Sequence, residues 1–305
     1  MLEALSMDPA IPLPFEGVVI AAYPSSLTVA VSQLTRDIVS VVTPDAGDGP
    51  HRIVVPLPVP WVDDGEVLPL VGSPVRCSRT RLDIPGSPVA FRLGSASPWR
   101  PYPAEPSPTA CAPDPSWLLP EVLAGSAAGF RKDPAKGNGL LASTGPRSDQ
   151  RPPFSPDPAE SAVCTRIAEL AAQHAFDRGG AMPLVVRRLL GSGPGLTPAG
   201  DDFLVGFAFG LEYLGGREAE PRLRALRHAL AAGIPDTGFV SGRFLSHCLA
   251  GRHPQHLLDL AAALASGDAA RIARSAATVL ATGSTSGRFT LMGIAASRGV
   301  MPCLS

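Results

Sequence analysis

The chain has 305 residues and a mass of 31.5 kDa, with 26 Lys plus Arg against 27 Asp plus Glu and a formal net charge of -1. This balance argues against a protein that binds nucleic-acid backbones, which needs a basic surface to neutralise phosphates. Apolar residues make up 45% and charged residues 17%, a composition too hydrophobic for a disordered chain. A length near 300 favours about two domains.

Several features of the sequence favour a soluble, cytoplasmic protein. No apolar run exceeds about a dozen residues, whereas a helix that crosses a bilayer needs about 20. The first ten residues carry two acids and no Lys or Arg, which is not the pattern of a signal peptide. The five cysteines are odd in number and contain no CxxC pair, so we expect reduced thiols.

Proline divides the chain into two parts. Of 34 prolines, 27 lie in residues 1–160. Proline removes a backbone donor and breaks helices, so this part cannot be mainly helical. Turn residues separate short, β-branched apolar runs, which lie at 17–22, 27–31, 38–42, 53–55, 67–71 and 89–93. The pattern predicts a small antiparallel β domain over residues 1–100.

A Pro-rich stretch follows over residues 101–158. Its first residues, Pro-Tyr-Pro-Ala-Glu-Pro-Ser-Pro, predict an extended polyproline linker. Within this linker we expect one short helix, over residues 117–130.

From residue 159 to 305 the pattern is helical. Asp157, Pro158 and Glu160 have the spacing of an N-cap, a first-turn proline and a capping-box acid. Apolar residues with a helical period predict further helices at 183–190, 198–214, 218–232, 240–250, 254–266, 269–281 and 289–298. The predicted fold class is therefore α+β, with a small N-terminal antiparallel β domain followed by an all-α C-terminal domain.

The most informative segment is a glycine-rich loop over residues 191–202, Gly-Ser-Gly-Pro-Gly-Leu-Thr-Pro-Ala-Gly-Asp-Asp. Thr197 and Pro198 predict the N-cap and the first residue of a helix. This helix is apolar on nearly all sides, so we expect it to be central and buried. Gly206 and Gly210 would let another backbone approach it closely. A flexible loop that leads into a central helix is suited to forming a ligand pocket.

Asp201 and Asp202 lie in the first turn of that helix. A nucleotide-binding loop is disfavoured, because the Gly-Lys-[Ser/Thr] ending is missing and two carboxylates would repel phosphate. The two acids are better suited to holding a cation, to accepting hydrogen bonds from a substrate amide, or to pairing with an arginine. The simpler alternative is that they only complement the helix dipole and that the loop is a connection.

The tetrapeptide Ser-Gly-Arg-Phe occurs twice, with its arginines at Arg243 and Arg288. Each lies near a predicted helix start, where a positive charge opposes the dipole. We therefore expect compensation by Asp201 or Asp202, or by an anionic ligand held in the guanidinium fork. Alternatively, both arginines point into solvent. The second copy follows a small-residue loop over 282–287, and two such loops facing each other would make one pocket.

Histidine and cysteine gather at a single place in the helical part. A metal site there has little support, because no HExxH or CxxC pattern is present. We expect these histidines on the surface and predict neither a metal nor a cofactor. Covalent catalysis is also disfavoured, since no serine lies in a GxSxG motif and nothing indicates an activated thiol. The residues of this cluster are His247, Cys248, His253 and His256.

The motif Gly-Pro-Gly-Leu-Thr-Pro-Ala-Gly-Asp-Asp-Phe at residues 193–203 resembles a particular bacterial family. It is similar to the accessory subunit of oxamate carbamoyltransferase from allantoin catabolism (AllH). Weaker similarity extends to Ala-Ser-Pro-Trp at 96–99, to residues 237–251 and to the loop at 283–287. Membership implies a subunit of an enzyme that interconverts oxalurate plus phosphate with oxamate plus carbamoyl phosphate, together with companion subunits.

This resemblance leads to a specific hypothesis for the site. Asp201 and Asp202 would be catalytic, either by hydrogen-bonding the NH groups of a small amide or ureido acid or by carrying a cation. Backbone and side-chain donors would receive the carboxylate of the substrate or a phosphate oxygen. These predicted substrate-binding residues are Gly193, Gly195, Leu196, Thr197, Arg243, Ser286, Gly287 and Arg288.

Two other functions stay open at this point. The chain could be a non-catalytic ligand-binding or assembly subunit, whose glycine-rich loop packs against a partner protein. It could also be a hydrolase with a metal ion at the Asp201–Asp202 pair, which would lose activity with a chelator.

Overall fold

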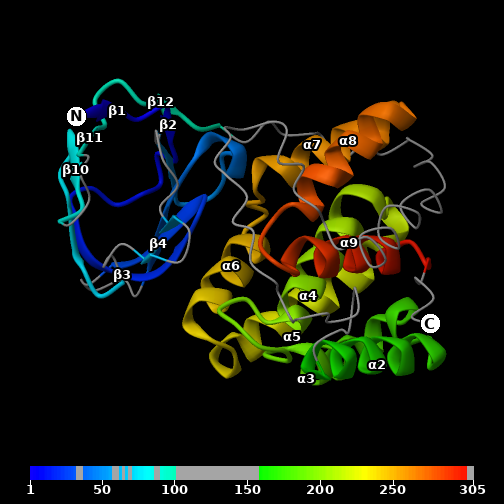
Figure 1. Cartoon of the computed structure of the whole chain (residues 1–305). Coiled ribbons are helices and arrows are strands. Elements are labelled where there is room, and N and C mark those ends of the chain that lie inside the picture. The colour runs from blue at the N-terminus through cyan, green and yellow to red at the C-terminus, as the bar shows by residue number, and fades with distance from the viewer. Residues whose placement is uncertain are drawn as a thin grey trace, which may run out of the picture. The chain divides into compact units, whose positions relative to one another are not determined.

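The protein was analysed as a computed structural model, which describes residues 1–31, 37–56, 62–63, 66–67, 71–85, 90–100 and 158–300 (Figure 1). These residues fall into two compact units. The first unit combines the N-terminal strands with Thr237–Ser266, and the second contains the other helices. The predicted linker and its short helix lie outside the described residues.

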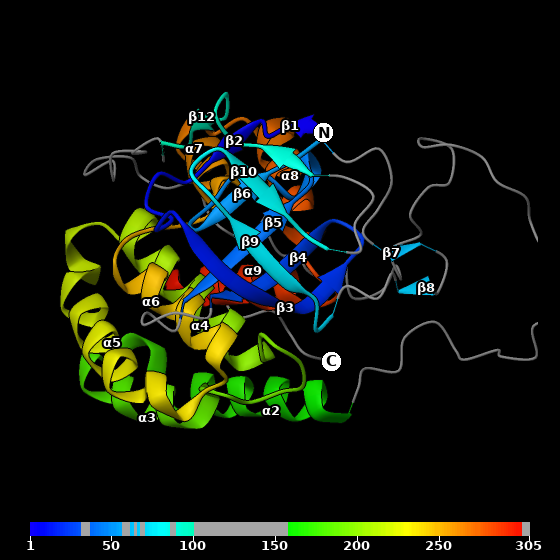
Figure 2. The same cartoon turned by 90° about the vertical axis from the view of Figure 1, so that its left-hand side faces the viewer.

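Ten strands of the first unit form one sheet, in the order β1-β11-β10-β9-β3-β4-β5-β6-β2-β12, and β7 pairs with β8. Most neighbours are antiparallel, and β3, β9 and β10 are seen as adjacent curved strands in Figure 2. The strands are β1 (Leu2–Glu3), β2 (Ser6–Met7), β3 (Phe15–Tyr23), β4 (Ser26–Val31), β5 (Ile38–Val42), β6 (Arg52–Val54), β7 (Val62–Asp63), β8 (Glu66–Val67), β9 (Pro74–Cys77), β10 (Arg81–Asp83), β11 (Phe91–Arg92) and β12 (Ser97–Pro98).

The first residues of the chain join the two ends of this sheet. The amide of Ala4 donates to the carbonyl of Arg92 beside one end, and the next amide, of Leu5, donates to Val54 near the other end. Because consecutive residues bond to opposite ends, the sheet must curl until these ends meet. Along β3, side chains alternate between the inside and the outside, which is the period expected of a strand with one buried face. The enclosed core contains Leu27, Val29, Ile53, Leu82 and Phe91.

Two helices, α6 (Phe239–Leu249) and α7 (Gln255–Ser266), belong to the unit that contains the sheet. The amide of Gln255 donates to the carbonyl of Asp48 at 3.0 Å, and the Trp99 indole donates to the Gln255 side chain at 3.3 Å. Residues 237–266 thus group with the strands, although residues 159–305 were predicted to form one helical domain.

The second unit is entirely helical in its described residues. Most of its helices lie within a few residues of the predicted ranges, because apolar periodicity and glycine or proline at the ends determine both. The first helix was expected to continue to about Gly179 but ends at Ala172. Short 3-10 turns connect them at Ala175–Asp177, Gly179–Ala181, Arg217–Ala219 and Ile234–Asp236. The helices are α2 (Pro158–Ala172), α3 (Met182–Leu189), α4 (Ala199–Leu214), α5 (Glu220–Gly233), α8 (Ala269–Leu280) and α9 (Ser286–Ser297).

Helices α4 and α9 pack against each other at backbone distance (Figure 1). A methyl group at Gly206 would overlap the carbonyl of Thr290, and one at Gly210 would overlap Ser297. The prediction that Gly206 and Gly210 admit another backbone is confirmed. Further along, the Arg298 guanidinium donates to the carbonyl of Leu214 at 2.5 Å. From Gly206 to Leu214 along α4, the residues contacted at the other helix rise in number from Thr290 to Arg298. The two helices are therefore parallel, and both N-termini lie at the same end of the pair.

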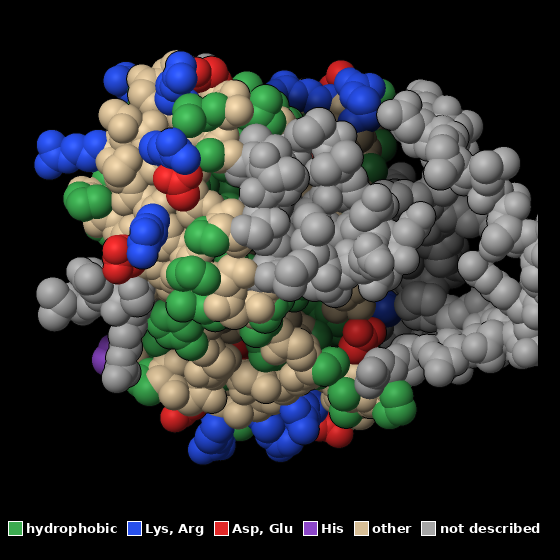
Figure 3. All heavy atoms as spheres, turned by 60° about the vertical axis from the view of Figure 1, so that its left-hand side comes forward, with side chains coloured by type: hydrophobic (Ala, Val, Ile, Leu, Met, Phe, Trp, Pro, Cys, Tyr) green, Lys and Arg blue, Asp and Glu red, His purple; other side chains and the backbone are tan. Residues whose placement is uncertain are grey.

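The predicted fold class is confirmed, since a curled sheet of mostly antiparallel strands precedes an all-helical region. Among the described residues, no helix is both long enough and apolar enough to span a membrane. On the face drawn in Figure 3, basic and acidic side chains of the described residues are interspersed rather than gathered by sign. This distribution agrees with the balanced composition.

The close contact between α4 and α9 makes Gly206 sensitive to substitution. Gly206→Ala should lower the free energy of unfolding by about 3 kcal/mol, because the added methyl meets backbone that cannot turn aside. Urea unfolding followed by circular dichroism measures this change. Gly180→Ala is the matched control, since a methyl group there meets nothing within 4 Å. Equal stability of the two variants would show that the helices are not packed at this distance.

Candidate functional site

The parallel packing of α4 and α9 brings two loops together. Thr197, just before α4, and Ser286, the first residue of α9, have their hydroxyl oxygens 3.1 Å apart. The prediction that the glycine-rich loop meets the 282–287 loop is thus supported by a direct contact. The predicted N-cap role of Thr197 is wrong. Pro198 is the N-cap and keeps an extended conformation (ψ 144°), so the Thr197 hydroxyl is available to Ser286.

The glycine-rich loop has a backbone that requires its glycines. Gly193 and Gly195 have φ angles of 111° and 93°, in the region that side chains disfavour. Asp201 is 1% exposed, and its Oδ1 accepts the amide hydrogen of Gly191 at 2.6 Å. Asp201 therefore holds the loop in place, and its carboxylate is turned toward the loop backbone. Leu196, at the tip, is 37% exposed.

Asp202 differs from its neighbour. Its Oδ2 is buried and accepts no hydrogen bond from the described residues. Burial raises the pKa of this carboxyl to about 8; the hydroxyls of Ser286 and Thr197 oppose the rise, while the negative charge of Asp201 adds to it. At neutral pH Asp202 is therefore mostly protonated.

A protonated carboxyl has a different chemistry from the paired carboxylates expected from the sequence. It offers one O–H donor and a carbonyl acceptor, whereas a carboxylate offers acceptors only. Such a group matches the edge of an amide, which also presents one donor and one acceptor. It also no longer repels an anionic oxygen, and the two helix N-termini beside it favour negative charge.

The remaining predicted binding residues divide between the two units. Gly287 packs so tightly on α8 that a methyl group would overlap the carbonyl of Val279. Arg288 lies in the first turn of α9, where its guanidinium carbon is 5.8 Å from the ring centre of Phe289. Burial raises the pKa of the Cys164 thiol in α2, and the charge of Arg288 opposes this rise.

Arg243 belongs to the first unit and has an acidic partner that the sequence analysis did not consider. Its Nη2 lies 2.9 Å from Oδ1 of Asp37, and its Nε donates to the same oxygen at 3.0 Å. A second ion pair joins Arg252, which follows α6, to the buried Asp8. Because Asp37 compensates Arg243, we do not include this arginine in the proposed substrate site.

The histidine cluster also differs from the prediction. His247 and His253 are 7% and 1% exposed, and Cys248 is buried, so the expectation of surface histidines is wrong for both. His247 lies one turn after Arg243 on α6 and faces the strands of the same unit. There its ring is 4.5 Å from that of His51, centre to centre, in an edge-to-face contact.

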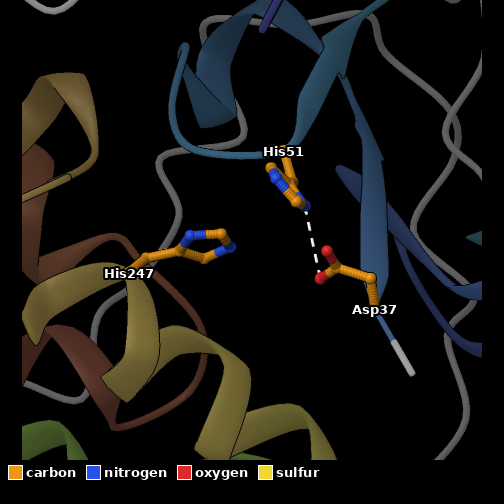
Figure 4. A group of neighbouring side chains, drawn as sticks. All are labelled: Asp37, His51 and His247. Carbon is orange, nitrogen blue, oxygen red and sulfur yellow. Dashed lines mark ion pairs between the residues drawn. The ribbon is translucent and has the colours of Figure 1, made fainter. Parts of the chain in front are cut away.

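His247, His51 and Asp37 form a compact group (Figure 4). Nδ1 of His51 lies 3.3 Å from Oδ1 of Asp37. Burial alone would raise the pKa of Asp37, but His51, the Ile38 amide and Arg243 together hold it well below its usual range. Burial and neighbouring positive charges lower the pKa of His247 to about 4. Sequence reasoning missed Asp37 and His51, because neither lies in a recognisable motif.

Comparison with known proteins shows that the segment containing these two loops is similar to a known family. Residues 189–298, which contain both loops and helices α4 and α9, match the family model described as oxamate carbamoyltransferase subunit AllH. Over this segment the chain is similar to that family, in agreement with the resemblance found in the glycine-rich motif. The searches of curated proteins and of solved structures gave no match.

The state of Asp202 predicts a pH dependence of stability. Its pKa is about 8 in the folded chain and near 3.8 when exposed, so between these values folding takes up a proton. Stability should therefore fall as pH rises from about 4 to 8. Asp202→Asn has no such proton to lose, so its free energy of unfolding should exceed that of wild type by a few kcal/mol more at pH 8 than at pH 4. This size follows because each unit of difference in pKa corresponds to about 1.4 kcal/mol.

Urea unfolding of the variant and wild type at several pH values measures the difference. The exposed Asp236, changed to Asn, serves as the control and should give a curve parallel to wild type. If the Asp202→Asn curve also runs parallel to wild type from pH 4 to 8, Asp202 is ionised in the folded protein.

Proposed function

We propose that the chain is a subunit of a carbamoyltransferase that binds a small amide or ureido acid, such as oxamate or oxalurate, beside Asp202. The observation that carries this proposal is the Asp202 side chain at the start of the central helix, whose Oδ2 is buried with no hydrogen-bond partner among the described residues, within the segment that matches the family. The description of the matching family supports the transferase class, and a subunit of such an enzyme works with companion subunits.

The proposed substrate has groups that complement this site. Oxamate carries a primary amide next to a carboxylate. The Asp202 carboxyl would donate to the amide oxygen and accept from the amide N–H. The carboxylate, or a phosphate oxygen of the co-substrate, would lie at the paired N-termini of α4 and α9. The donors at that place would be the loop amides of Gly193, Gly195 and Leu196 and the hydroxyl of Thr197. All four residues directly precede α4 in the sequence.

The reaction itself needs no covalent intermediate with the protein. The amide nitrogen of oxamate attacks the carbamoyl carbon, the C–O bond to phosphate breaks, and the proton lost from nitrogen goes to phosphate. The protein would contribute by orienting the two substrates and by stabilising the developing charge. Among these groups Asp202 is the central one, because it fixes the nucleophilic amide.

This proposal predicts the effect of removing the Asp202 carboxyl. In the complete complex with companion subunits, Asp202→Ala should lower kcat/KM for phosphate-dependent cleavage of oxalurate by roughly 100-fold, as for loss of a preorganised donor. Asp202→Asn should lose less, because a carboxamide keeps one donor and one acceptor. Carbamoyl phosphate formation is the measured quantity.

Asp236→Ala, an exposed acid of the same unit, is the matched control and should leave turnover unchanged. Turnover of Asp202→Ala within twofold of wild type would refute the assignment.

An assembly role is the alternative, and the exposed Leu196 at the loop tip is the observation that favours it. In that case Asp202→Ala would reduce co-purification of the companion subunits, and Leu196→Ser would do so too. Size-exclusion chromatography of the complex separates the two functions. The transferase proposal requires that Asp202→Ala assembles normally.

A further inference from the structure

The group formed by Asp37, His51 and His247 lies in the first unit and takes no part in the proposed carbamoyl transfer. Each residue offers one ligand atom, and these atoms lie within 4.8 Å of one another. Three different segments supply them: the residue before β5, the turn before β6, and helix α6. Figure 4 shows the His247 ring directed toward the other two side chains.

The spacing of two of these atoms suits a shared cation. Nδ1 of His51 and Oδ1 of Asp37 are 3.3 Å apart. In a tetrahedral zinc site with metal–ligand bonds near 2.05 Å, two ligand atoms are also roughly 3.3 Å apart. Nδ1 of His51 also lies 3.2 Å from the carbonyl oxygen of Ile38. A metal ion could replace a proton on Nδ1 at the present spacing of Nδ1 and Oδ1, and only His247 would need to approach.

His247 supplies an observation that a purely structural network does not explain. The side chain is 7% exposed, and its Nε2 is buried with no hydrogen-bond partner among the described residues. Leaving such a group unsatisfied costs about 1–3 kcal/mol. A metal ion bonded to Nε2 would remove this cost.

Neighbouring groups hold the candidate ligands in place. Oδ2 of Asp8 accepts the amide hydrogen of His51 at 2.6 Å, and His51 has a φ of 51°, an uncommon value for a residue with a side chain. The Ile38 amide donates to Asp37 at 2.9 Å, as does Arg243. Such outer contacts typically orient metal ligands.

We propose that Asp37, His51 and His247 bind a divalent transition-metal ion such as Zn²⁺. Two imidazoles and one carboxylate are a ligand set that first-row ions of this kind accept, with further positions for water or another ligand. The charges of Asp37 and Asp8 are already balanced by Arg243 and Arg252. The ion would therefore keep its positive charge and favour hydroxide or an anionic small molecule in the remaining positions.

Metal binding to the purified full chain tests this proposal without any activity assay. After removal of metals with a chelator, Zn²⁺ should bind with a stoichiometry of one. Co²⁺ should give the visible absorption of a nitrogen- and oxygen-ligated site. His247→Gln and His51→Gln should each weaken Zn²⁺ binding roughly 100-fold or more, since each removes a direct ligand.

The exposed pair His174 and Asp177, 3.5 Å apart, is a surface site at which a metal ion could bind adventitiously. His174→Ala is therefore the matched control and should leave Zn²⁺ affinity unchanged. Failure of wild type to bind one Zn²⁺, or equal binding by wild type and both glutamine variants, would overturn the proposal. Should a glutamine variant not fold, the Co²⁺ spectrum of wild type decides, because absorption without histidine ligands overturns it as well.

Discussion

The organisation of the helical unit depends on the backbone contact between α4 and α9. Gly206 and Gly210 on one helix allow the other to approach without intervening side chains, and Gly293 does the same from α9. Because the helices are parallel, this contact also brings their N-termini together. The loops before both helices consequently meet at Thr197 and Ser286. The candidate substrate site is a result of how two helices pack, not of the glycine-rich loop alone.

Two aspartates with buried carboxyl oxygens illustrate how surroundings decide the state of a carboxyl group. Asp37 is surrounded by an arginine, an imidazole and a backbone amide, so it stays ionised despite burial. Asp202 has hydroxyl groups and another acid beside it, which do not offset the loss of water. One aspartate is thereby suited to pairing with cations, whereas the other is suited to exchanging hydrogen bonds with a neutral or anionic ligand.

Much of the fold could be predicted from local patterns. Helix positions followed from apolar periodicity and terminal glycines, and the glycines of α4 indicated the close approach of another backbone. The contact between the two small-residue loops was likewise expected. The protonation state of Asp202 could not be predicted, because two adjacent acids with the same sequence context have different partners. The partner of Arg243 could not be predicted, since Asp37 lies 206 positions away without a motif.

The histidines show the same limit more clearly. His247 was considered beside its sequence neighbours, although its spatial neighbours are His51 and Asp37. The His247 side chain is buried because α6 packs with the strands. An amphipathic pattern predicts a helix but does not predict against which unit that helix packs. Local sequence therefore predicts secondary structure better than it predicts which distant side chains share one site.

The path of the chain, which leaves the first unit after the strands and returns to it for residues 237–266, has a consequence for how this protein is made. The strands emerge from the ribosome long before α6 and α7, so Asp8 and Asp37 meet their arginine partners only after helices α2, α3, α4 and α5 have been synthesised. In turn, α4 cannot pack against its partner until α9 has been synthesised. The first unit should therefore reach its final form only after α7 has been synthesised, and the second only after α9.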